Sequence, residues 1–441
     1  MKKLIQIFFV FFTLIGIAYP QTWSPYGNGI EFGSVSSVLV YRNQLIAAGT
    51  FATSGGTWLG NIGKWNGSTW EPLGSGISGG IYAMTVYNDK LIVGGDFDTA
   101  GGVFRKYIAC WDSTGWSSFG AEMPNPVYAL TVYGGDLYAG TGNNEILQCF
   151  WRWNGSAWSF PGGGIPRNFV NSFTIYNGNL ILGGDFDSVG TTRSQCVAGW
   201  NGSSFSTFGI GFNGTVFTVG TFGTYLLASG TFTNINTIPV NRIAKWTGTH
   251  WDSVGGGITE GEMVLSFYNY QGYLIAGGSF NAIDYVTAHN IAKWNGTTWS
   301  PIGQGMGGPV LALCTYNNKL TAAGGFDTSG SVTVNNIAYW DHPIGIQNST
   351  SEIPEKYILY QNFPNPFNPS TTIKFSIPKA SYVSLKVYDI KGSIVANMIN
   401  EYMNPGVYYS PFNGDGLSSG VYFYKLETES FTDTKRMIIL K

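Results

Sequence analysis

The chain has little charge for its length. Of 441 residues, 23 are basic and 25 are acidic, so charged residues make up 11% and the formal net charge is −2. An average soluble protein has about 25% charged residues. Nucleic-acid binding depends on lysine and arginine facing phosphates, and no basic tract is present. The composition therefore excludes nucleic acid as a partner, and the 16% aromatic content excludes a disordered chain.

Long apolar runs are also absent, except at the start of the sequence. Lys2 and Lys3 precede an apolar stretch from Leu4 to Ile17, and a small residue, Ala18, follows. This order is typical of a secretory signal peptide, which we place at residues 1–18. The run is shorter than the roughly 20 apolar residues of a membrane span. We therefore expect an exported mature protein without a transmembrane segment.

Cysteine is rare, with Cys110, Cys149, Cys196 and Cys314 as the only four. None has CxxC or Cys/His metal spacing. Each falls in a predicted strand of a different repeat, where a small thiol fits a buried position. We predict four buried free thiols and no metal centre.

A repeat of about 46 residues occupies the middle of the sequence. An L-x-x-x-G-x-F segment recurs with its leucines 43 to 48 residues apart, and one copy, at Leu137, is degenerate. The leucines are Leu45, Leu91, Leu137, Leu180, Leu226, Leu274 and Leu320. Each copy is followed by an N-I-A-K-W-like segment and, in the first six, by a second aromatic residue five positions after the tryptophan.

Each repeat resolves into four short strands. VYALTVY at Val127–Tyr133 represents the first strand, the leucine segment is the second, N-I-A-K-W is the third, and an S-T-W-E-P-like segment is the fourth. Asn-Gly between the third and fourth strands predicts a type I′ hairpin turn. A period of this length with four strands predicts an all-β, seven-bladed β-propeller over residues 22–340.

The phase of the repeat predicts how the ring closes. A lone fourth strand at Thr22–Gly27 opens the sequence of the ring, and three strands from Val310 to Trp340 end it. We expect the N-terminal strand to complete the last blade, which leaves no unpaired edge. The recurring tryptophans are interpreted as core residues between blades. The strand–GG–strand–aromatic–turn–W pattern resembles a kelch-type propeller.

A different pattern begins after Trp340. Residues 341–356 are polar and aperiodic, which is typical of a linker. Alternating apolar and polar residues in SLKVYDI and GVYFYKLE then predict a small immunoglobulin-like β-sandwich over residues 357–441.

This module resembles the C-terminal sorting domain of the type IX secretion system of Bacteroidetes-like bacteria. Its motifs are NFPNPF at 362–367, VYDIKG at 387–392, LSSGVYFYK at 417–425 and a basic-then-apolar end. The residues that carry the resemblance are Asn365, Pro366, Tyr388, Asp389, Gly392, Gly420, Lys435 and Lys441. The resemblance implies that the type IX machinery and its sortase are partners, and that the protein is extracellular or on the outer cell surface.

The loops of the ring supply the candidate ligand-binding residues. In propellers the active face carries the connections from the second to the third strand and from the fourth strand to the next blade. The charged residues on these connections are Arg105, Lys106, Glu122, Arg167, Arg193, Arg242, Glu260, Glu262, Asp284 and His289. They do not repeat between blades, which suits a single asymmetric site and equally suits solvated loops.

Catalytic chemistry has little support. His250, His289 and His342 lie on different segments, so paired-histidine copper sites and nucleophile–histidine–acid triads are not expected. We interpret the Asp96 and Asp185 D-F-D segments as turn formers, because calcium loops supply five or six oxygens. We expect a non-enzymatic, cofactor-free module that binds a surface polysaccharide or a protein. The alternative is a carbohydrate-active enzyme that uses carboxylates such as Glu260 and Glu262.

Overall fold

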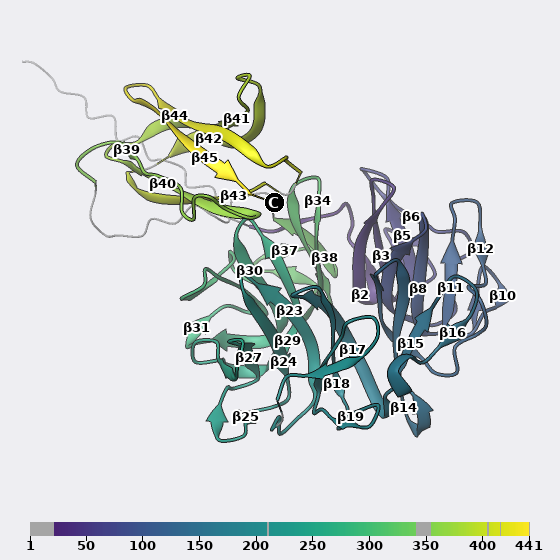
Figure 1. The fold of residues 1–441 in the computed structure, drawn as a ribbon. Helices are drawn as coiled ribbons and strands as arrows, with labels where there is room; N and C mark the ends of the chain where they lie inside the picture. Colours follow the sequence, from purple (N-terminus) through teal and green to yellow (C-terminus); the bar gives the residue numbers. More distant parts are fainter. Residues whose placement is uncertain (1–21, 210, 341–353, 404, 415, 441) are drawn as a thin grey trace, which may run out of the picture.

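The computed structural model describes residues 22–440 except 210, 341–353, 404 and 415. The expected signal peptide (1–18) and most of the expected linker (341–356) lie outside the described residues. Within them the fold is all-β, and the one helical element is a 3-10 turn at Pro161–Gly163 (Figure 1).

Twenty-eight strands form seven units, each with four strands in antiparallel order. The first strands of units 1 to 7 are β2 (Glu31–Tyr41), β7 (Gly80–Tyr87), β13 (Val127–Tyr133), β17 (Pro166–Tyr176), β23 (Val216–Phe222), β29 (Ile258–Tyr270) and β34 (Val310–Tyr316). The second strands are β3 (Gln44–Ser54), β8 (Lys90–Asp96), β14 (Asp136–Gln148), β18 (Asn179–Asp185), β24 (Tyr225–Gly230), β30 (Tyr273–Ile283) and β35 (Lys319–Gly324).

The third and fourth strands are shorter. The third strands are β5 (Ile62–Trp65), β11 (Ile108–Trp111), β15 (Phe150–Trp153), β21 (Val197–Trp200), β27 (Ile243–Trp246), β32 (Ile291–Trp294) and β38 (Ile337–Trp340). The fourth strands are β6 (Trp70–Pro72), β12 (Trp116–Ser117), β16 (Trp158–Ser159), β22 (Phe205–Thr207), β28 (Trp251–Ser253), β33 (Trp299–Pro301) and β1 (Ser24–Pro25).

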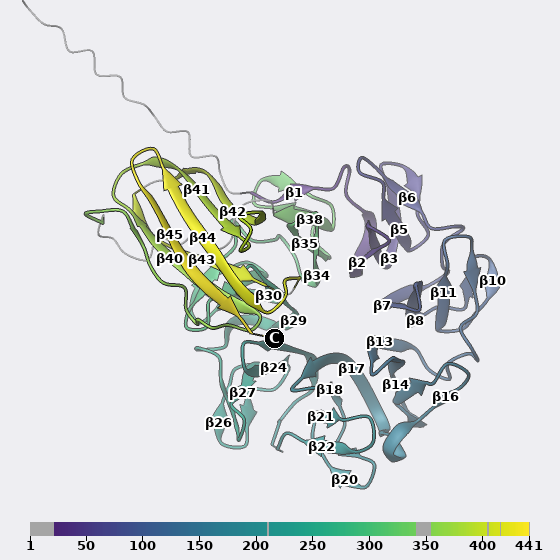
Figure 2. The same ribbon diagram turned by 45° about the horizontal axis from the view of Figure 1, so that its top comes forward.

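The first strands contact one another in chain order, and β34 also contacts β2, so the units surround a common centre (Figure 2). β1 pairs with β38 in the register Ser24↔Tyr339, the closing pairing that the repeat phase predicted.

The joint between units 3 and 4 differs from the others. β14 extends past its own unit and pairs with β17 at Gly142↔Phe169, which merges units 3 and 4 into one sheet.

Short hairpins that the sequence analysis did not predict occupy the connections between second and third strands. Four are separate ribbons: β9 (Thr99–Ala100) with β10 (Val103–Phe104), β19 (Ser188–Val189) with β20 (Thr192–Arg193), β25 (Asn234–Ile235) with β26 (Ile238–Pro239), and β36 (Thr328–Ser329) with β37 (Val332–Thr333). In units 1 and 6, β4 (Thr57–Trp58) and β31 (Val286–Thr287) instead pair with the ends of β3 and β30.

The type I′ prediction for the Asn-Gly turns was wrong. Trp65 pairs with Trp70, so the connection is a four-residue loop, and only its glycine, Gly67, has positive φ. The Asn66 side chain accepts hydrogen bonds from the backbone N–H groups of Ser68 and Thr69 at 2.9 Å, which stabilises a longer loop. Paired positive φ angles occur instead between first and second strands, as at Asn317 and Asn318.

The recurring tryptophans lie at joints between units. The fourth-strand tryptophan donates its indole N–H to a backbone carbonyl of the preceding unit, for example Trp116 Nε1 to Leu73 O at 2.8 Å. The same bond joins Trp70 to Tyr26, Trp251 to Phe208, Trp299 to Val254 and Trp23 to Ile302. All five indoles are buried, so the interpretation of these residues as core is confirmed.

An asparagine before the third strand makes a second recurring bridge. Asn336 accepts a hydrogen bond from the Phe326 N–H at 2.9 Å and donates to the Ile30 carbonyl of unit 1 at 2.8 Å. Its φ is +66°, a conformation that asparagine tolerates better than most residues. Asn61 and Asn290 make the same two bonds at their joints.

The C-terminal module has seven strands in two sheets. One sheet contains β39 (Ile358–Leu359), β40 (Ser370–Ile377) and β43 (Gly406–Asn413), and the other contains β41 (Ser381–Tyr388), β42 (Ile394–Met403), β44 (Gly420–Thr428) and β45 (Thr432–Ile439). Alternate residues of both sheets, such as Phe375 and Leu385, form one buried cluster. The alternation in the sequence therefore corresponds to a two-layer core.

Candidate ligand-binding face

The repeat gives the ring two faces. The loop face is the side with the connections from second to third strands and from each unit to the next. The turn face is the side with the tight turns. Antiparallel order puts these two sets of connections at opposite ends of the strands. All ten candidate residues lie on or beside loop-face connections, but they come from five different units.

Three of these candidates stabilise the loops. Arg105 donates to the carbonyls of Ala100 and Trp116, which ties a hairpin to the fourth strand of unit 2. Asp284 accepts a hydrogen bond from the Gly256 N–H at 2.7 Å. Arg242 has φ +70°, and its carbonyl accepts the Ser229 hydroxyl at 2.7 Å. The side chains of Arg105 and Asp284 therefore stabilise loops, and Arg242 contributes through its backbone.

The other candidates are dispersed. Glu122, Arg193 and Glu262 are exposed, and Lys106 has its ammonium 4.8 Å from the centre of the Tyr107 ring. The side chain of Arg167 lies outside the described part of the chain. Among the described residues no group of three or more His, Cys, Asp or Glu side chains could hold a metal ion.

Glu260 and His289 are the two candidates connected to a cavity. Glu260 accepts a hydrogen bond from Asn281 Nδ2 at 3.1 Å. Asn281 and His289 line a cavity of about 510 Å³ between units 6 and 7, together with Asn290, Gln304, Met306, Gly307, Thr328 and Gly330. We call it the 6/7 cavity.

A second cavity, of about 410 Å³, lies at the next joint, between units 7 and 1. It is lined by Ile30, Glu31, Phe32, Gly33, Asp327, Asn335 and Asn336, and we call it the 7/1 cavity. The two cavities occupy equivalent places, because the bridging asparagines Asn290 and Asn336 line one each. Between them is one segment of unit 7, in which Asp327 lines one cavity and Thr328 the other.

Four exposed aromatic residues of this face are not among the candidates predicted from the sequence. Phe32 lies at the loop-face end of β2, and Trp58, Phe104 and Tyr285 lie on connections between second and third strands; all four are exposed. They were overlooked because aromatic residues were interpreted through the repeat, which these four do not follow. Their positions outside the tryptophan spacing are the signal that could have identified them.

The four thiols are buried and free, as predicted. Burial raises the pKa of Cys196 to about 11 and that of Cys314 to about 12. Both thiols therefore stay protonated near neutral pH, and neither supplies a nucleophilic thiolate.

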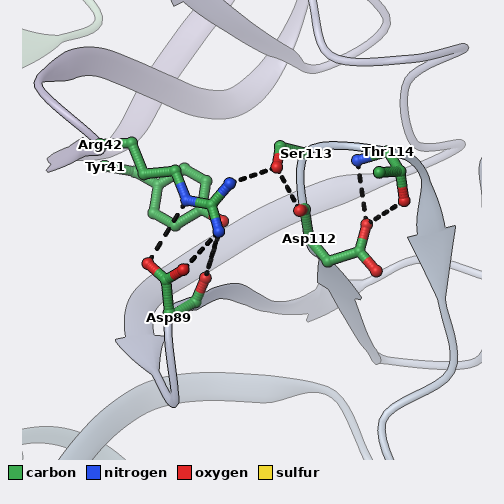
Figure 3. Close-up of polar contacts among 6 residues, drawn as sticks. All are labelled: Tyr41, Arg42, Asp89, Asp112, Ser113 and Thr114. Atoms are coloured by element: carbon green, nitrogen blue, oxygen red, sulfur yellow. Dashed lines mark hydrogen bonds and ion pairs between the residues drawn. The ribbon is translucent and has the colours of Figure 1, made fainter.

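The turn face is held by a polar network that joins units 1 and 2 (Figure 3). Arg42 forms an ion pair with Asp89 and donates to the Ser113 hydroxyl, while Tyr41 donates to the Asp89 carbonyl at 2.9 Å. Hydrogen bonds from the Thr114 hydroxyl and from nearby backbone N–H groups lower the pKa of Asp112 to about 2. The ion pair between Arg42 and Asp89 therefore joins the turn after β2 to the turn after β7.

In the C-terminal module, the first motif is bonded to the last strand. Asn365 Oδ1 accepts the Ile438 N–H at 2.9 Å, and Pro366 lies in the same segment. The Phe367 N–H donates to the Ile438 carbonyl and the Phe367 carbonyl accepts the Leu440 N–H, both at 3.0 Å. The segment that opens the module is therefore stabilised by the residues that end it.

The second motif is a turn. Asp389, directly after Tyr388 at the end of β41, accepts the backbone N–H groups of Lys391 and Ser393 at 2.9 and 2.8 Å, and Gly392 has φ +81°. Gly420 begins β44, and Lys435 on β45 lies 3.7 Å from Asp433. Lys441 lies outside the described residues.

Comparison with known proteins identifies the C-terminal module. The family described as "Secretion system C-terminal sorting domain" matches residues 361–440, which contain every motif residue named above except Lys441. This match indicates export to the cell surface or the extracellular space. In the described part of the chain, no helix is long and apolar enough to span a membrane.

No curated protein matches the chain. A solved structure of PorZ, described as an essential bacterial surface component of the type-IX secretion system of Porphyromonas gingivalis, is similar with a TM-score of 0.44 and 13% sequence identity. The similarity covers 97% of this chain and 61% of that one, so this chain spans less than two thirds of its length.

Proposed function

We propose that this protein is a secreted or surface-attached β-propeller that binds a glycan or a protein through its loop face and has no enzyme activity. The type IX machinery would export it, and the associated sortase would process its C-terminal module. The sorting-domain match at 361–440 supports the export step. Seven four-stranded units whose first strands contact one another in a cycle support a kelch-like ring.

The observation that carries the binding function is the pair of cavities at consecutive joints of one face. Ligand sites are concave and contain a few convergent polar groups. The 6/7 and 7/1 cavities meet that description, with amide, hydroxyl and carboxylate side chains around each. The cavities differ in lining although their positions are equivalent, as a single asymmetric site requires.

A carboxylate-based hydrolase is the second candidate. Glu31 and Asp327 line the same cavity, and glycoside hydrolysis uses a pair of carboxyl groups on either side of the scissile bond. One Glu31 oxygen accepts the Thr53 hydroxyl at 3.1 Å, which leaves the other oxygen for a substrate. Paired loss of turnover in Glu31→Gln and Asp327→Asn variants would favour this candidate.

The test is a glycan-array screen of the purified protein, with release of reducing ends measured on every hit. Binding without turnover is the expected result. Turnover that depends on the two carboxylates would move the protein to the enzyme class. Binding to no glycan, together with capture of a surface protein, would assign the loop face to protein recognition.

Export is tested separately, because it depends on a different part of the chain. Deletion of residues 357–441 should leave the protein in the periplasm, since the sorting domain is then missing. Normal amounts of the truncated protein outside the cell would contradict the proposed route. A variant with Asp389→Ala tests whether the turn of the second motif is needed while the rest of the module is retained.

A further inference from the structure

The connection into unit 1 is longer than those into units 2, 5 and 7, as are the connections into units 4 and 6. In units 2, 5 and 7, a buried residue at the entry to the unit lies four positions before a buried valine or isoleucine. Examples are Ile77 before Ile81 and Met306 before Val310, where the carbonyls of Ile77 and Met306 accept the asparagine bridge of the preceding unit. In unit 1 the corresponding residues, Ile30 and Val35, are five positions apart. The extra residue lies in the segment that contains Phe32.

Phe32 is held in an unusual conformation. Its φ is +58°, which is a left-handed conformation and rare for a bulky side chain. The ring is 79% exposed, so burial of the ring does not compensate for the conformation. Residues kept in this region without a packing reason cluster at functional sites.

The side chains around Phe32 are polar. Glu31 and Asp327 bring two carboxylates to the 7/1 cavity, and Asn335 brings an amide whose Nδ2 is 2.8 Å from the Asn28 carbonyl. Across the unit 7 segment, the 6/7 cavity has uncharged or weakly basic groups, among them Gln304 and His289. The two cavities, which lie on either side of the segment with Asp327 and Thr328, therefore both offer hydrogen-bonding groups, and the 7/1 cavity also has an aromatic ring.

We propose that these cavities are consecutive subsites for an oligosaccharide, with one sugar ring stacked on Phe32 in the 7/1 cavity and the next in the 6/7 cavity. The inference rests on the proposed binding function and names its ligand class. The C–H face of a pyranose packs on an aromatic ring, while amides and carboxylates bind its hydroxyl groups. A protein partner does not require this combination of a lone exposed ring with small polar cavities.

The charges of the 7/1 cavity set the selectivity. Glu31 and Asp327 repel a carboxylate, so a uronic acid in this subsite is disfavoured. The same carboxylates accept hydrogen bonds from neutral hydroxyl groups and attract an amino group. The site should therefore bind neutral and amine-bearing oligosaccharides and reject acidic ones.

The experiment compares two glycine variants of the purified full chain. Phe32→Gly and Tyr285→Gly each remove an exposed aromatic residue of the loop face with positive φ, since Tyr285 is 85% exposed with φ +62°. Phe32 lines the 7/1 cavity, whereas Tyr285 lines neither the 7/1 cavity nor the 6/7 cavity. Glycine favours positive φ, so both variants should have a Tm equal to or above that of the parent protein.

The probes are hexasaccharides of glucose, mannose, N-acetylglucosamine, glucosamine and galacturonic acid, measured by calorimetry. We expect binding of one or more of the neutral or amine-bearing probes, a loss of at least tenfold in Phe32→Gly, and less than twofold change in Tyr285→Gly. Phe32→Tyr should keep binding. The double variant Glu31→Gln and Asp327→Asn should gain affinity for the galacturonate probe.

Three results would overturn the inference. They are equal affinity in Phe32→Gly and the parent protein, a preference of the parent protein for galacturonate, and binding of none of the five probes. If the array or surface capture still finds a ligand in those cases, the proposed binding function stands and only the assignment of these cavities is wrong. If no ligand of any class binds the loop face, the binding function itself fails.

Discussion

Replacement of Asn336 by alanine should open the joint between the last unit and the first. The Asn336 side chain is buried and bridges the Phe326 N–H and the Ile30 carbonyl, residues that are about 300 positions apart in the chain. Alanine removes both bonds and leaves two backbone groups without their partner. Each unsatisfied buried group costs about 1–3 kcal/mol, and alanine at φ +66° costs about 1 kcal/mol more.

The expected loss is therefore about 3–7 kcal/mol, a large part of the 5–15 kcal/mol that stabilises a typical domain. By thermal unfolding followed with near-UV circular dichroism, the Tm should fall by roughly 5–10 °C. Limited proteolysis should cut the segment before Ile30 first, because β1 is held in the last unit by a pairing of only two residues.

Two further variants separate the contributions. Asn336→Gly loses the same bonds but removes the left-handed strain, so it should be about 1 kcal/mol more stable than Asn336→Ala. Asn61→Ala breaks the same bridge at the joint between units 1 and 2 and should not expose the N-terminal segment to protease. A Tm within 1 °C of the parent protein in Asn336→Ala would refute the role given to this bridge.

Three other predictions follow from single contacts. Burial lowers the pKa of Lys293 from 10.5 to about 8, so between pH 8 and 10.5 the unfolded chain holds a proton that the folded chain lacks. The free energy of unfolding should therefore rise as the pH increases through this window. Lys293→Met should abolish this rise and increase the free energy of unfolding at pH 7 by up to about 3 kcal/mol. Cys196 occupies the position of the bridging asparagines and has φ +65°. Cys196→Asn should stabilise the protein by about 1–2 kcal/mol in urea unfolding, because asparagine can donate to the Phe212 carbonyl and tolerates this φ. A lower urea midpoint would contradict the equivalence of this position with the bridging asparagines. Trp116→Phe removes the indole bond to Leu73 and should cost about 2 kcal/mol in the same assay, whereas an unchanged midpoint would show that the bond contributes nothing.

The periodic part of the structure was predictable from the sequence. Val127–Tyr133 is a strand with the bounds that the pattern gave, and the N-terminal segment pairs with β38 as the phase required. The sequence repeat contains residues, such as Trp116 and its counterparts, that recur because every joint needs the same packing. The positions of these residues therefore predicted the order of the strands.

The candidate site was not predictable in the same way. The charged loop residues were selected because they lie on the loop-face connections, and that criterion cannot separate a ligand contact from a loop contact such as that of Asp284 with Gly256. The cavity residues Phe32 and Asp327 depend on a one-residue insertion and on the meeting of two chain ends. Neither is visible until the first and last units are placed side by side.

The joint between units 3 and 4 shows how the ring accommodates the loss of its recurring bonds. Phe205 stands where five other units have the indole donor, and Cys149 stands where three other joints have the bridging asparagine. Different side-chain bonds cross this joint: the Cys149 thiol donates to the Asn168 carbonyl at 2.9 Å, and the Trp200 indole donates to the Tyr138 hydroxyl at 3.2 Å. At this joint β14 pairs directly with β17 through backbone hydrogen bonds. Backbone pairing requires no particular side chain, so it can replace side-chain bridges in a unit whose sequence has diverged. The joint between units 4 and 5 has Cys196 at the bridging position, and its sheets are separate in the described part of the chain. The merged sheet therefore accompanies the degenerate copy at Leu137 and does not follow from the loss of the asparagine alone.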